Sequence, residues 1–255
     1  MRVENSFIPV TGVGETTERS IWEAGATDWS SFEADLVGPT IGDRIESFIE
    51  TAEPHLQSRD ARFFADRFPR GEFWRLYENF RRDTLFLDIE TTGLDHHRDV
   101  VTTVSLHKNG ETNTLVRGQD LDSGRLRRAF EDAKLLATFN GRQFDVPFLE
   151  TSFDLDVDVP HLDLRFLARR LDLTGGLKTI EREVGIERDR PDISGRDAVR
   201  LWRQYERGDR DALETLVSYN RADTRNLETL LDIVSARLHD RVAPRAVFPE
   251  RSERA

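Results

Sequence analysis

Two acidic residues stand where a strand ends and a turn begins. Asp88 and Glu90 close the apolar run Leu85 to Glu90, and side chains two residues apart on a strand share a face. A turn at Thr91-Thr92-Gly93 follows, and α/β proteins usually bind their ligands at such strand ends. Adjacent carboxylates repel unless a cation lies between them, and a hard divalent cation with oxygen ligands is the simplest candidate. A solvated strand end is the alternative that this pattern leaves open.

Further residues of the same chemistry occur later in the chain. Asp145 lies in the first turn of an expected helix, where the helix dipole alone would also favour an aspartate. Tyr219 and Asp223 are four residues apart on the last long helix and therefore share a face, although a packed tyrosine beside an exposed aspartate has the same spacing. Taken together, four carboxylates and one tyrosine are the residues required for a two-metal phosphoryl-transfer site.

The elements that would position these residues form a mixed sheet with helices. β-branched alternation and the hairpin signal Asn109-Gly110 predict an antiparallel meander of three strands, followed by a strand, a helix and a fifth short strand. The expected strands are 85–90, 100–107, 112–117, 135–139 and 161–164, and the expected helices are 121–132, 144–152, 165–171, 176–184, 195–206 and 209–238. The pattern predicts an α/β domain over 84–238.

Residues 1–83 predict a small helical region, and residues 239–255 predict a polar, frayed tail. The expected helical stretches are a segment opening at Thr11 to Gly14 and stopping near Gly25, then 28–36, 41–49 limited by Pro54, and 63–80 broken at 69–71. Val10 to Gly14 resembles the turn of a helix-hairpin-helix element, whose backbone amides bind a DNA phosphate. Few residues precede Gly12 and the acids Glu15 and Glu18 follow it, so a purely structural helical cap is the alternative.

The order and spacing of the acidic residues resemble the DEDDy class of 3′→5′ exonucleases in the RNase H-like superfamily. Asp88 to Gly93 resembles the first motif of that class, and Asn140 to Leu149 is similar to its second motif in family-B polymerase proofreading domains. Tyr219 to Asp223 matches the third motif, Tyr-x-x-x-Asp. The resemblance covers about 84–238 and implies an RNase H-like mixed five-stranded sheet flanked by helices.

Within that superfamily the chain resembles the YprB-type branch. The segments that carry this resemblance are Trp74-Arg75-Leu76-Tyr77, His161-Leu162-Asp163-Leu164, Leu177 to Glu181 and Asp192-Ile193-Ser194-Gly195.

The resemblance to the exonucleases also implies roles for the motif residues. Asp88 would bridge two metal ions about 3.5–4 Å apart, Glu90 and Asp223 would hold the ion that carries the attacking water, and Asp145 would support the other ion. Tyr219 would orient that water or help to deprotonate it. Two ions of Mg²⁺ or Mn²⁺ suit an all-oxygen site.

A second group of residues would contact nucleic acid. The resemblance implies that Thr92, Gly93, Leu94, Asn140 and Phe144 approach the terminal nucleotide, although Phe144 could equally belong to the core. Arg142, Arg165 and Arg221 could contact phosphates or could simply be solvated side chains. Asp163 could support the site or cap the helix that follows it. His96 and His97 are expected in a loop.

Composition narrows the class of protein. The 255 residues contain 37 Lys and Arg and 48 Asp and Glu, which give a net charge of −11 and argue against a broad basic DNA-binding surface. Only three of the basic residues are lysines, and this acidic, arginine-rich balance predicts adaptation to a salt-rich cytoplasm. Cysteine is absent and MRVENSFIPV lacks a signal-peptide apolar run, so we expect an intracellular soluble protein without disulfides or a membrane span.

These observations lead to one principal hypothesis. The sequence predicts a metal-dependent 3′→5′ exonuclease that hydrolyses phosphodiester bonds at single-stranded DNA or RNA ends. A structure-selective endonuclease of RNase H type is the second hypothesis. A non-catalytic nucleic-acid-binding subunit with a dormant site is the third, and the presence of all four acids and the tyrosine disfavours it. Any repair or replication partner would be a separate chain.

Overall fold

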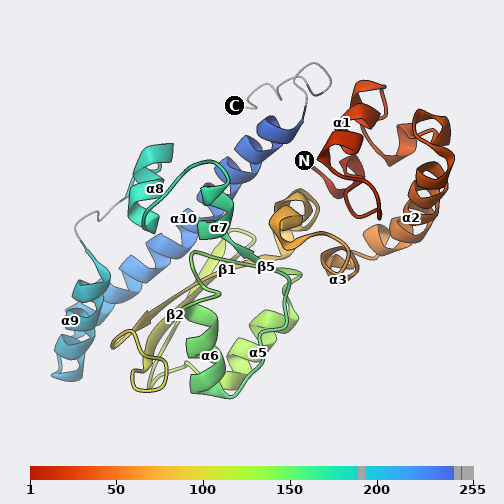
Figure 1. The fold of residues 1–255 in the computed structure, drawn as a ribbon. Coiled ribbons are helices and arrows are strands. Elements are labelled where there is room, and N and C mark those ends of the chain that lie inside the picture. Colours follow the sequence, from red (N-terminus) through yellow and green to blue (C-terminus); the bar gives the residue numbers. More distant parts are fainter. Residues whose placement is uncertain (189–192, 244–247, 249–255) are drawn as a thin grey trace. The chain divides into compact units, whose positions relative to one another are not determined.

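The chain folds into two compact units. The computed structural model describes residues 1–188, 193–243 and 248 (Figure 1). One unit contains Met1–Phe80 together with Val234–Ala255, and the other contains Arg81–Ile233. Asp192, which belongs to one of the segments that resemble YprB-type proteins, lies outside the described residues.

The first unit is helical, as predicted, but two of its expected helices differ. The stretch 28–36 forms two short 3-10 turns, Trp29–Ser31 and Ala34–Leu36, because the Asp28 and Ser31 side chains bond the backbone and end the first turn early. The helix expected over 41–49 is longer, since α2 spans Pro39–Gln57 and contains Pro54 in its last turn. The other elements of the unit are η1 (Val3–Asn5), α1 (Glu15–Glu23), α3 (Ala61–Ala65), η4 (Arg70–Leu76) and α4 (Tyr77–Phe80).

The segment that resembles a helix-hairpin-helix element serves the core of this unit. Only the 3-10 turn η1 precedes Gly12, so the first helix of that motif is absent. Gly12 has φ +97°, and a Cβ there would lie 2.8 Å from Ile41 Cδ1. The backbone amide of Val13 bonds the carbonyl of Val10 rather than remaining available for a phosphate. These contacts favour the structural cap over a DNA-binding turn.

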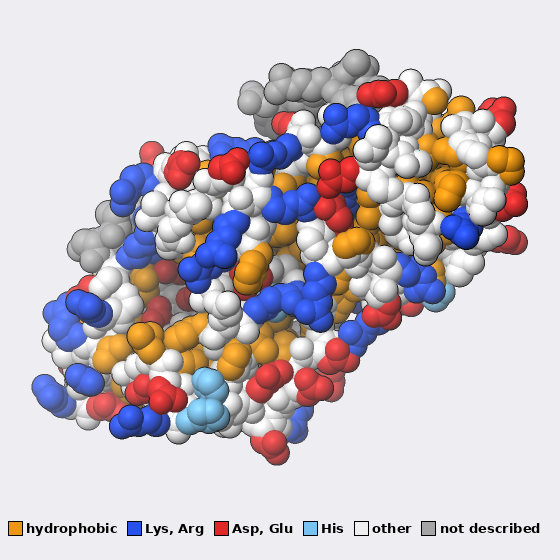
Figure 2. All heavy atoms as spheres, in the orientation of Figure 1, with side chains coloured by type: hydrophobic (Ala, Val, Ile, Leu, Met, Phe, Trp, Pro, Cys, Tyr) orange, Lys and Arg blue, Asp and Glu red, His pale blue; other side chains and the backbone are white. Residues whose placement is uncertain are grey.

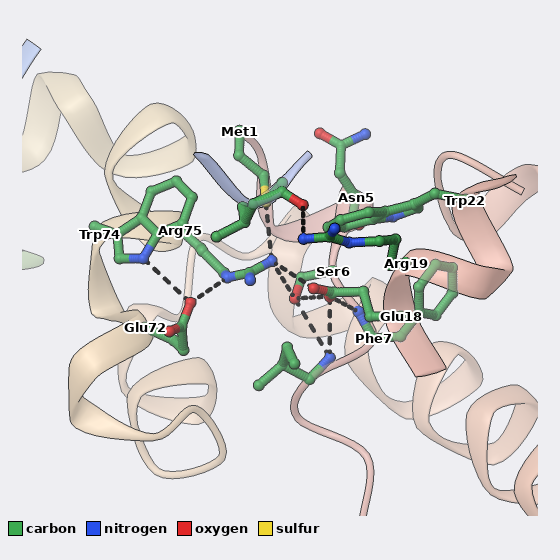
Figure 3. A network of polar contacts seen from close by, with 12 residues as sticks. Met1, Asn5, Ser6, Phe7, Glu18, Arg19, Trp22, Glu72, Trp74 and Arg75 are labelled. Carbon is green, nitrogen blue, oxygen red and sulfur yellow. Dashed lines mark hydrogen bonds and ion pairs between the residues drawn. The ribbon is translucent and has the colours of Figure 1, made fainter. Parts of the chain in front are cut away.

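A buried ion-pair network joins three segments of the first unit (Figure 3). Arg75 is fully buried, and its guanidinium contacts Glu18 at 3.0 Å and Glu72 at 2.6 Å. Glu18 also accepts hydrogen bonds from the Ser6 hydroxyl at 2.7 Å and from the Phe7 amide at 2.8 Å. The N-terminal segment is thus attached to α1 and η4 by polar contacts inside the core.

The end of the last helix belongs to the first unit as well. α10 spans Arg210–Val242, so the polar tail expected from residue 239 begins later than predicted. Leu238 is fully buried, and burial of an apolar side chain favours continuation of the helix to this point. The Trp22 ring packs edge-on against Phe248, with ring centroids 5.4 Å apart.

The second unit is built on the predicted five-stranded mixed sheet. Its strand order is β3-β2-β1-β4-β5. The first three strands form the expected antiparallel meander, whereas β4 is parallel to β1 and β5 is parallel to β4. The strands are β1 (Thr84–Thr91), β2 (Val101–Lys108), β3 (Glu111–Val116), β4 (Leu135–Thr138) and β5 (His161–Asp163). Asn109 and Gly110 both have positive φ, as the predicted two-residue hairpin requires.

The predicted helices of this unit are confirmed with small shifts at their ends. They are α5 (Ser123–Glu131), α6 (Asp145–Phe153), α7 (Leu164–Arg169), α8 (Leu177–Val184), α9 (Gly195–Glu206) and α10. Leu85, Leu87 and Ile89 of β1 pack with α5 and α6 in one buried cluster. The alternate side chains Asp88 and Glu90 therefore lie on the other face of the sheet. Helix α10 lies on that side of the sheet (Figure 1), and its Asn220 contacts Asp88. None of the helices described is both long and apolar enough to cross a membrane.

Candidate functional site

Strand β1 extends beyond the end of its parallel neighbour β4, and Asp145 of the second motif binds to the extended part. The pairing of β1 with β4 ends at Phe86 and Ala137, whereas β1 pairs with β2 as far as Thr91. The backbone N–H of Ile89 therefore has no strand partner on that side, and it donates to the Asp145 carboxylate. This hydrogen bond holds Asp145 of α6 beside the strand end that carries Asp88 and Glu90.

The turn before Asp145 is braced by a buried aspartate. Asp163 accepts backbone N–H bonds from Asn140 at 2.8 Å, Arg142 at 3.2 Å and Arg165 at 3.1 Å. The last of these caps α7, and the first two hold the turn that contains Asn140, whose φ is +66°. Asp163 is therefore a helix cap, one of its two expected roles, and it also holds the turn that leads to Asp145.

Helix α10 supplies the third motif. Tyr219 and Asp223 lie one turn apart, both are buried, and the tyrosine hydroxyl is hydrogen-bonded to the Asp223 carboxylate. The Arg188 guanidinium contacts Asp223 and also Glu181 of α8. The fully buried Glu181 accepts a second hydrogen bond from Asn226 Nδ2 at 3.1 Å, so α8 and α10 are joined beside the site.

The four acids are close enough to perturb one another. Burial raises the pKa of Asp88 far above its usual range, and the charges of Glu90, Asp145 and Asp223 raise it further. Burial and the charges of Asp223 and Asp145 likewise raise the pKa of Glu90. Burial raises the pKa of Asp145 to about 7 and that of Asp223 to about 6, although Arg188 opposes the shift at Asp223. The structure thus brings together the four predicted carboxylates at one end of the sheet.

The donor set fits a hard cation, but its present arrangement is not that of a metal site. Within the described ranges, no group of three His, Cys, Asp or Glu side chains is arranged to hold a metal ion. One Asp88 oxygen accepts the amide of Asn220 at 2.7 Å, and Asp223 is engaged by Arg188. All four acids are nevertheless oxygen donors whose mutual repulsion a divalent cation would relieve. The fit therefore rests on the chemistry of the donors and on their electrostatic coupling.

Three residues near the acids had no predicted role. Lys178 Nζ lies 5.2 Å from the centroid of the Tyr219 ring, and its charge lowers the pKa of Glu90 and of Asp223. Arg188 and Asn220 contact carboxylates as described above. Lys178 lies in the segment Leu177 to Glu181 and Asn220 lies inside the third motif, so the sequence marked both positions without indicating their contacts. Arg188 carried no comparable signal.

The turn after β1 contains one very exposed apolar side chain. Thr92 accepts the Val100 amide through its hydroxyl at 3.0 Å, and a Cβ on Gly93 would lie 2.3 Å from Asp99 Oδ2. These two residues fix the turn, and Leu94 beyond them is 86% exposed. Its side chain is therefore available to a ligand at the end of β1.

The other expected substrate contacts are partly engaged with the protein. Asn140 Oδ1 accepts a hydrogen bond from the Arg165 guanidinium at 2.7 Å. The ring centroids of Phe144 and Phe148 are 4.8 Å apart, and Phe144 packs against the buried cluster that contains the apolar side chains of β1. Arg142 donates to the His161 carbonyl at 2.8 Å, and Arg221 donates to the Thr112 carbonyl at 2.9 Å. His96 and His97 lie in a turn, as expected.

The surface around this end of the sheet is mixed in charge. Figure 2 shows acidic side chains recessed in a hollow that is bordered by hydrophobic side chains and by Lys and Arg side chains. A small cavity of about 80 Å³ is lined by Arg188, Tyr219, Asp223 and Asn226, among others. On the face drawn, basic side chains are interspersed with acidic ones, as the negative net charge predicts.

The raised pKa of Asp145 predicts a stability that depends on pH. Between the usual aspartate value of 3.8 and about 7, the folded protein holds a proton that the unfolded chain loses. The Asp145 carboxyl therefore stabilises the folded protein at low pH, and this stabilisation is lost as the pH rises from 3.8 through about 7. Asp145→Asn should raise the free energy of unfolding in EDTA by about 1–3 kcal/mol more near pH 8 than near pH 5.

Urea unfolding of the metal-free protein at the two pH values measures this difference. The exposed Asp156, changed to Asn, is the matched control and should show no such dependence on pH. An equal effect of Asp145→Asn at both pH values would show that the Asp145 carboxyl is not perturbed.

The chain matches one family model and is similar to several solved structures. Residues 85–235 match the family model described as RNase_H superfamily. Among solved structures, Brucella melitensis NrnC with bound Mg2+ is similar over 67% of this chain and 81% of its own, at 20% identity and a TM-score of 0.46. The family B DNA polymerase from the hyperthermophilic archaeon Pyrobaculum calidifontis is similar over 60% of this chain and 25% of its own, at 17% identity and a TM-score of 0.47. No curated protein matches the chain.

Proposed function

Because this chain belongs to the RNase H superfamily, we propose that it is a metal-dependent 3′→5′ exonuclease of the DEDDy type. Its substrates would be single-stranded DNA or RNA ends, and its reaction would be hydrolysis of the terminal phosphodiester bond. The observation that supports the proposal best is the cluster of Asp88, Glu90, Asp145 and Asp223, whose burial and mutual repulsion call for divalent cations. Membership of the YprB-type branch and a cytoplasmic location remain predictions from the sequence.

The resemblance to DEDDy exonucleases suggests a role for each residue of the cluster. Bound Mg²⁺ or Mn²⁺ ions would activate the attacking water and neutralise charge on the phosphoryl oxygens. Asp88 and Glu90 project from one strand face and would hold both ions together with Asp145 and Asp223. Asp223 can accept a cation fully only when Arg188 releases it. The Tyr219 hydroxyl, held by Asp223, would orient the water that attacks phosphorus.

In the metal-free protein Tyr219 is surrounded by carboxylates. Burial and the neighbouring carboxylates raise the pKa of the tyrosine far above its usual value. Its hydroxyl therefore stays protonated in the metal-free protein and donates to a carboxylate. Once cations neutralise these carboxylates, Tyr219 would orient the attacking water or help to deprotonate it.

A time course on labelled oligonucleotides tests the proposed function. Single-stranded DNA and RNA carrying a 5′ label are incubated with the full chain in molar KCl and in low salt, with Mg²⁺, Mn²⁺ or EDTA. We expect a ladder that shortens from the 3′ end in either metal and disappears in EDTA. Internal cuts would instead support an RNase H-type endonuclease. Binding without any cleavage by folded protein would support a non-catalytic nucleic-acid-binding subunit.

Leu94 provides a prediction about substrate binding. An exposed leucine beside the acidic cluster can pack on the terminal bases, and complete burial of such a side chain contributes roughly 1.5–3 kcal/mol. Leu94→Ala should raise the KM for a single-stranded oligonucleotide by about tenfold, which corresponds to about 1.4 kcal/mol, and should leave kcat within a factor of about two. Initial rates over a range of oligonucleotide concentrations separate the two constants.

A matched control exists for this variant. Phe166 is 42% exposed, and it is the other large hydrophobic side chain exposed in the part of the chain that the structure describes. Phe166→Ala should leave KM unchanged. An unchanged KM in Leu94→Ala would show that the side chain does not contact the substrate.

A further inference from the structure

Asn220 contacts the first carboxylate of the site from inside the protein. It follows Tyr219 on α10 and is fully buried. Its Nδ2 donates to Asp88 Oδ2 at 2.7 Å and also lies 3.3 Å from the Asp88 carbonyl oxygen. The hydrogen bond lowers the pKa of Asp88 and so opposes the effects of burial and of the other acids. Asn220 is therefore the neutral donor that the structure places against this carboxylate.

A second residue holds the Asn220 amide in place. The Thr103 hydroxyl on β2 lies 2.9 Å from Asn220 Oδ1, and Thr103 is fully buried. An amide oxygen can only accept a hydrogen bond, so the threonine must donate its proton to Oδ1. A flipped amide would turn its oxygen toward Asp88 and its NH₂ toward Thr103. An ionised Asp88 carboxylate can only accept hydrogen bonds, so it sets the orientation that presents NH₂ to it, and the Thr103 hydroxyl holds the amide in place by donating to Oδ1.

The geometry of the sheet explains why Thr103 can do this. Thr103 pairs with Glu90 across β1 and β2, and paired residues of neighbouring strands project to the same face. Thr103, Glu90 and Asp88 therefore all project toward α10. The hydrogen bonds Thr103–Asn220, which is buried, and Asn220–Asp88, which is part-buried, connect β2, α10 and β1. Tyr219 precedes Asn220 on α10, and Asp223 lies one turn after Tyr219.

We propose that Asn220 is a positioning residue that holds the Asp88 carboxylate in one orientation for cation binding, with its own amide held in place by Thr103. The expected effect on catalysis rests on the proposed nuclease function. The test by Mn²⁺ binding does not. A neutral amide satisfies one lone pair of Asp88 Oδ2 and leaves Oδ1 available, and it brings no positive charge that would compete with a metal ion. Arg188, in contrast, engages Asp223 through a full charge.

Mn²⁺ binding by the full-length protein, measured without substrate by electron paramagnetic resonance, is the primary readout. Asn220→Ala should weaken Mn²⁺ binding about 10- to 100-fold, as is usual when a residue that orients a metal ligand is removed. On the oligonucleotide substrate it should lower kcat by a similar factor and leave KM nearly unchanged. Thr103→Val keeps the shape of the side chain and should cause a smaller loss in the same direction.

The double variant distinguishes positioning from a general loss of packing. If Thr103 acts through Asn220, Thr103→Val should weaken Mn²⁺ binding no further in the Asn220→Ala background. Thr224→Val is the matched control, since the buried Thr224 hydroxyl donates to the Asn220 backbone carbonyl at 2.7 Å and not to Asp88. It should lower the melting temperature without changing Mn²⁺ affinity.

The outcomes separate this proposal from the proposed function. Wild-type Mn²⁺ affinity in both single variants would overturn the positioning role, and so would two losses that add independently. If Asn220→Ala does not fold, the Mn²⁺ affinity of Thr103→Val alone decides whether the positioning role holds. A wild-type protein that binds Mn²⁺ but cleaves no nucleic acid would refute the nuclease function and leave the positioning role to be decided by Mn²⁺ affinity. A wild-type protein that binds no Mn²⁺ would overturn both.

Discussion

Asp88→Asn should reduce the rate of nucleotide release by about a thousandfold or more, because ligation of metal ions accounts for several kcal/mol of transition-state stabilisation. Asparagine preserves the shape of the side chain but removes the charge that both expected ions would share. The free energy of unfolding in EDTA should stay the same or rise, since the substitution removes a buried charge from an acidic cluster. Single-turnover cleavage of a 5′-labelled oligonucleotide measures the rate.

The exposed Asp156, changed to Asn, is the control for this experiment as well, and it should retain the wild-type rate. A variant at Asp88 that is folded and still cleaves at more than about a tenth of the wild-type rate would show that the cluster is not the catalytic centre. The unfolding curve in EDTA shows whether an inactive Asp88 variant is folded.

Arg75→Met should destabilise the first unit by about 3–5 kcal/mol, because removal of one partner leaves uncompensated charge inside the protein. Glu18 and Glu72 both contact the buried guanidinium (Figure 3). Burial already raises the pKa of Glu18, and the Arg75 charge is the largest of the effects that oppose this. Tryptophan fluorescence during urea unfolding is suited to the measurement, since Trp22, Trp29 and Trp74 lie in this unit and Trp202 in the other.

Two further variants test the cause of that loss. Arg2→Met removes an exposed pair with Glu4 and should cost less than about 1 kcal/mol. Adding Glu18→Gln to Arg75→Met should restore part of the lost stability, because the second substitution removes one of the uncompensated charges. A loss below about 1 kcal/mol in Arg75→Met would mean that water enters the site and solvates the carboxylates.

Much of the second unit could be predicted from local sequence. The strands of the meander follow from β-branched alternation, and the positive φ values of Asn109 and Gly110 are those that a two-residue hairpin needs. The failures in the first unit have local causes too. Asp28 and Ser31 bond the backbone and break one expected helix into turns. Pro54 lies in the last turn of α2, where its missing N–H removes one helix hydrogen bond without ending the helix.

The contacts of the site were harder to predict than its residues. Asp88 and Glu90 share a strand face through a period of two, which the sequence displays directly. The position of Asp145 depends on where β4 stops pairing with β1, which leaves the Ile89 amide free to bind it. The contacts of Arg188 and Asn220 depend on how α8, α10 and β2 pack together, and no spacing along the chain encodes such contacts.

Anomalous diffraction from crystals soaked in Mn²⁺ tests the central claim most directly. The account predicts two manganese peaks at the end of β1, both in contact with Asp88, with Glu90, Asp145 and Asp223 completing the ligands and Arg188 withdrawn from Asp223. Asp88→Asn crystals in the same form should lose both peaks. Manganese bound elsewhere, or no manganese at the four acids at saturating concentration, would contradict the account.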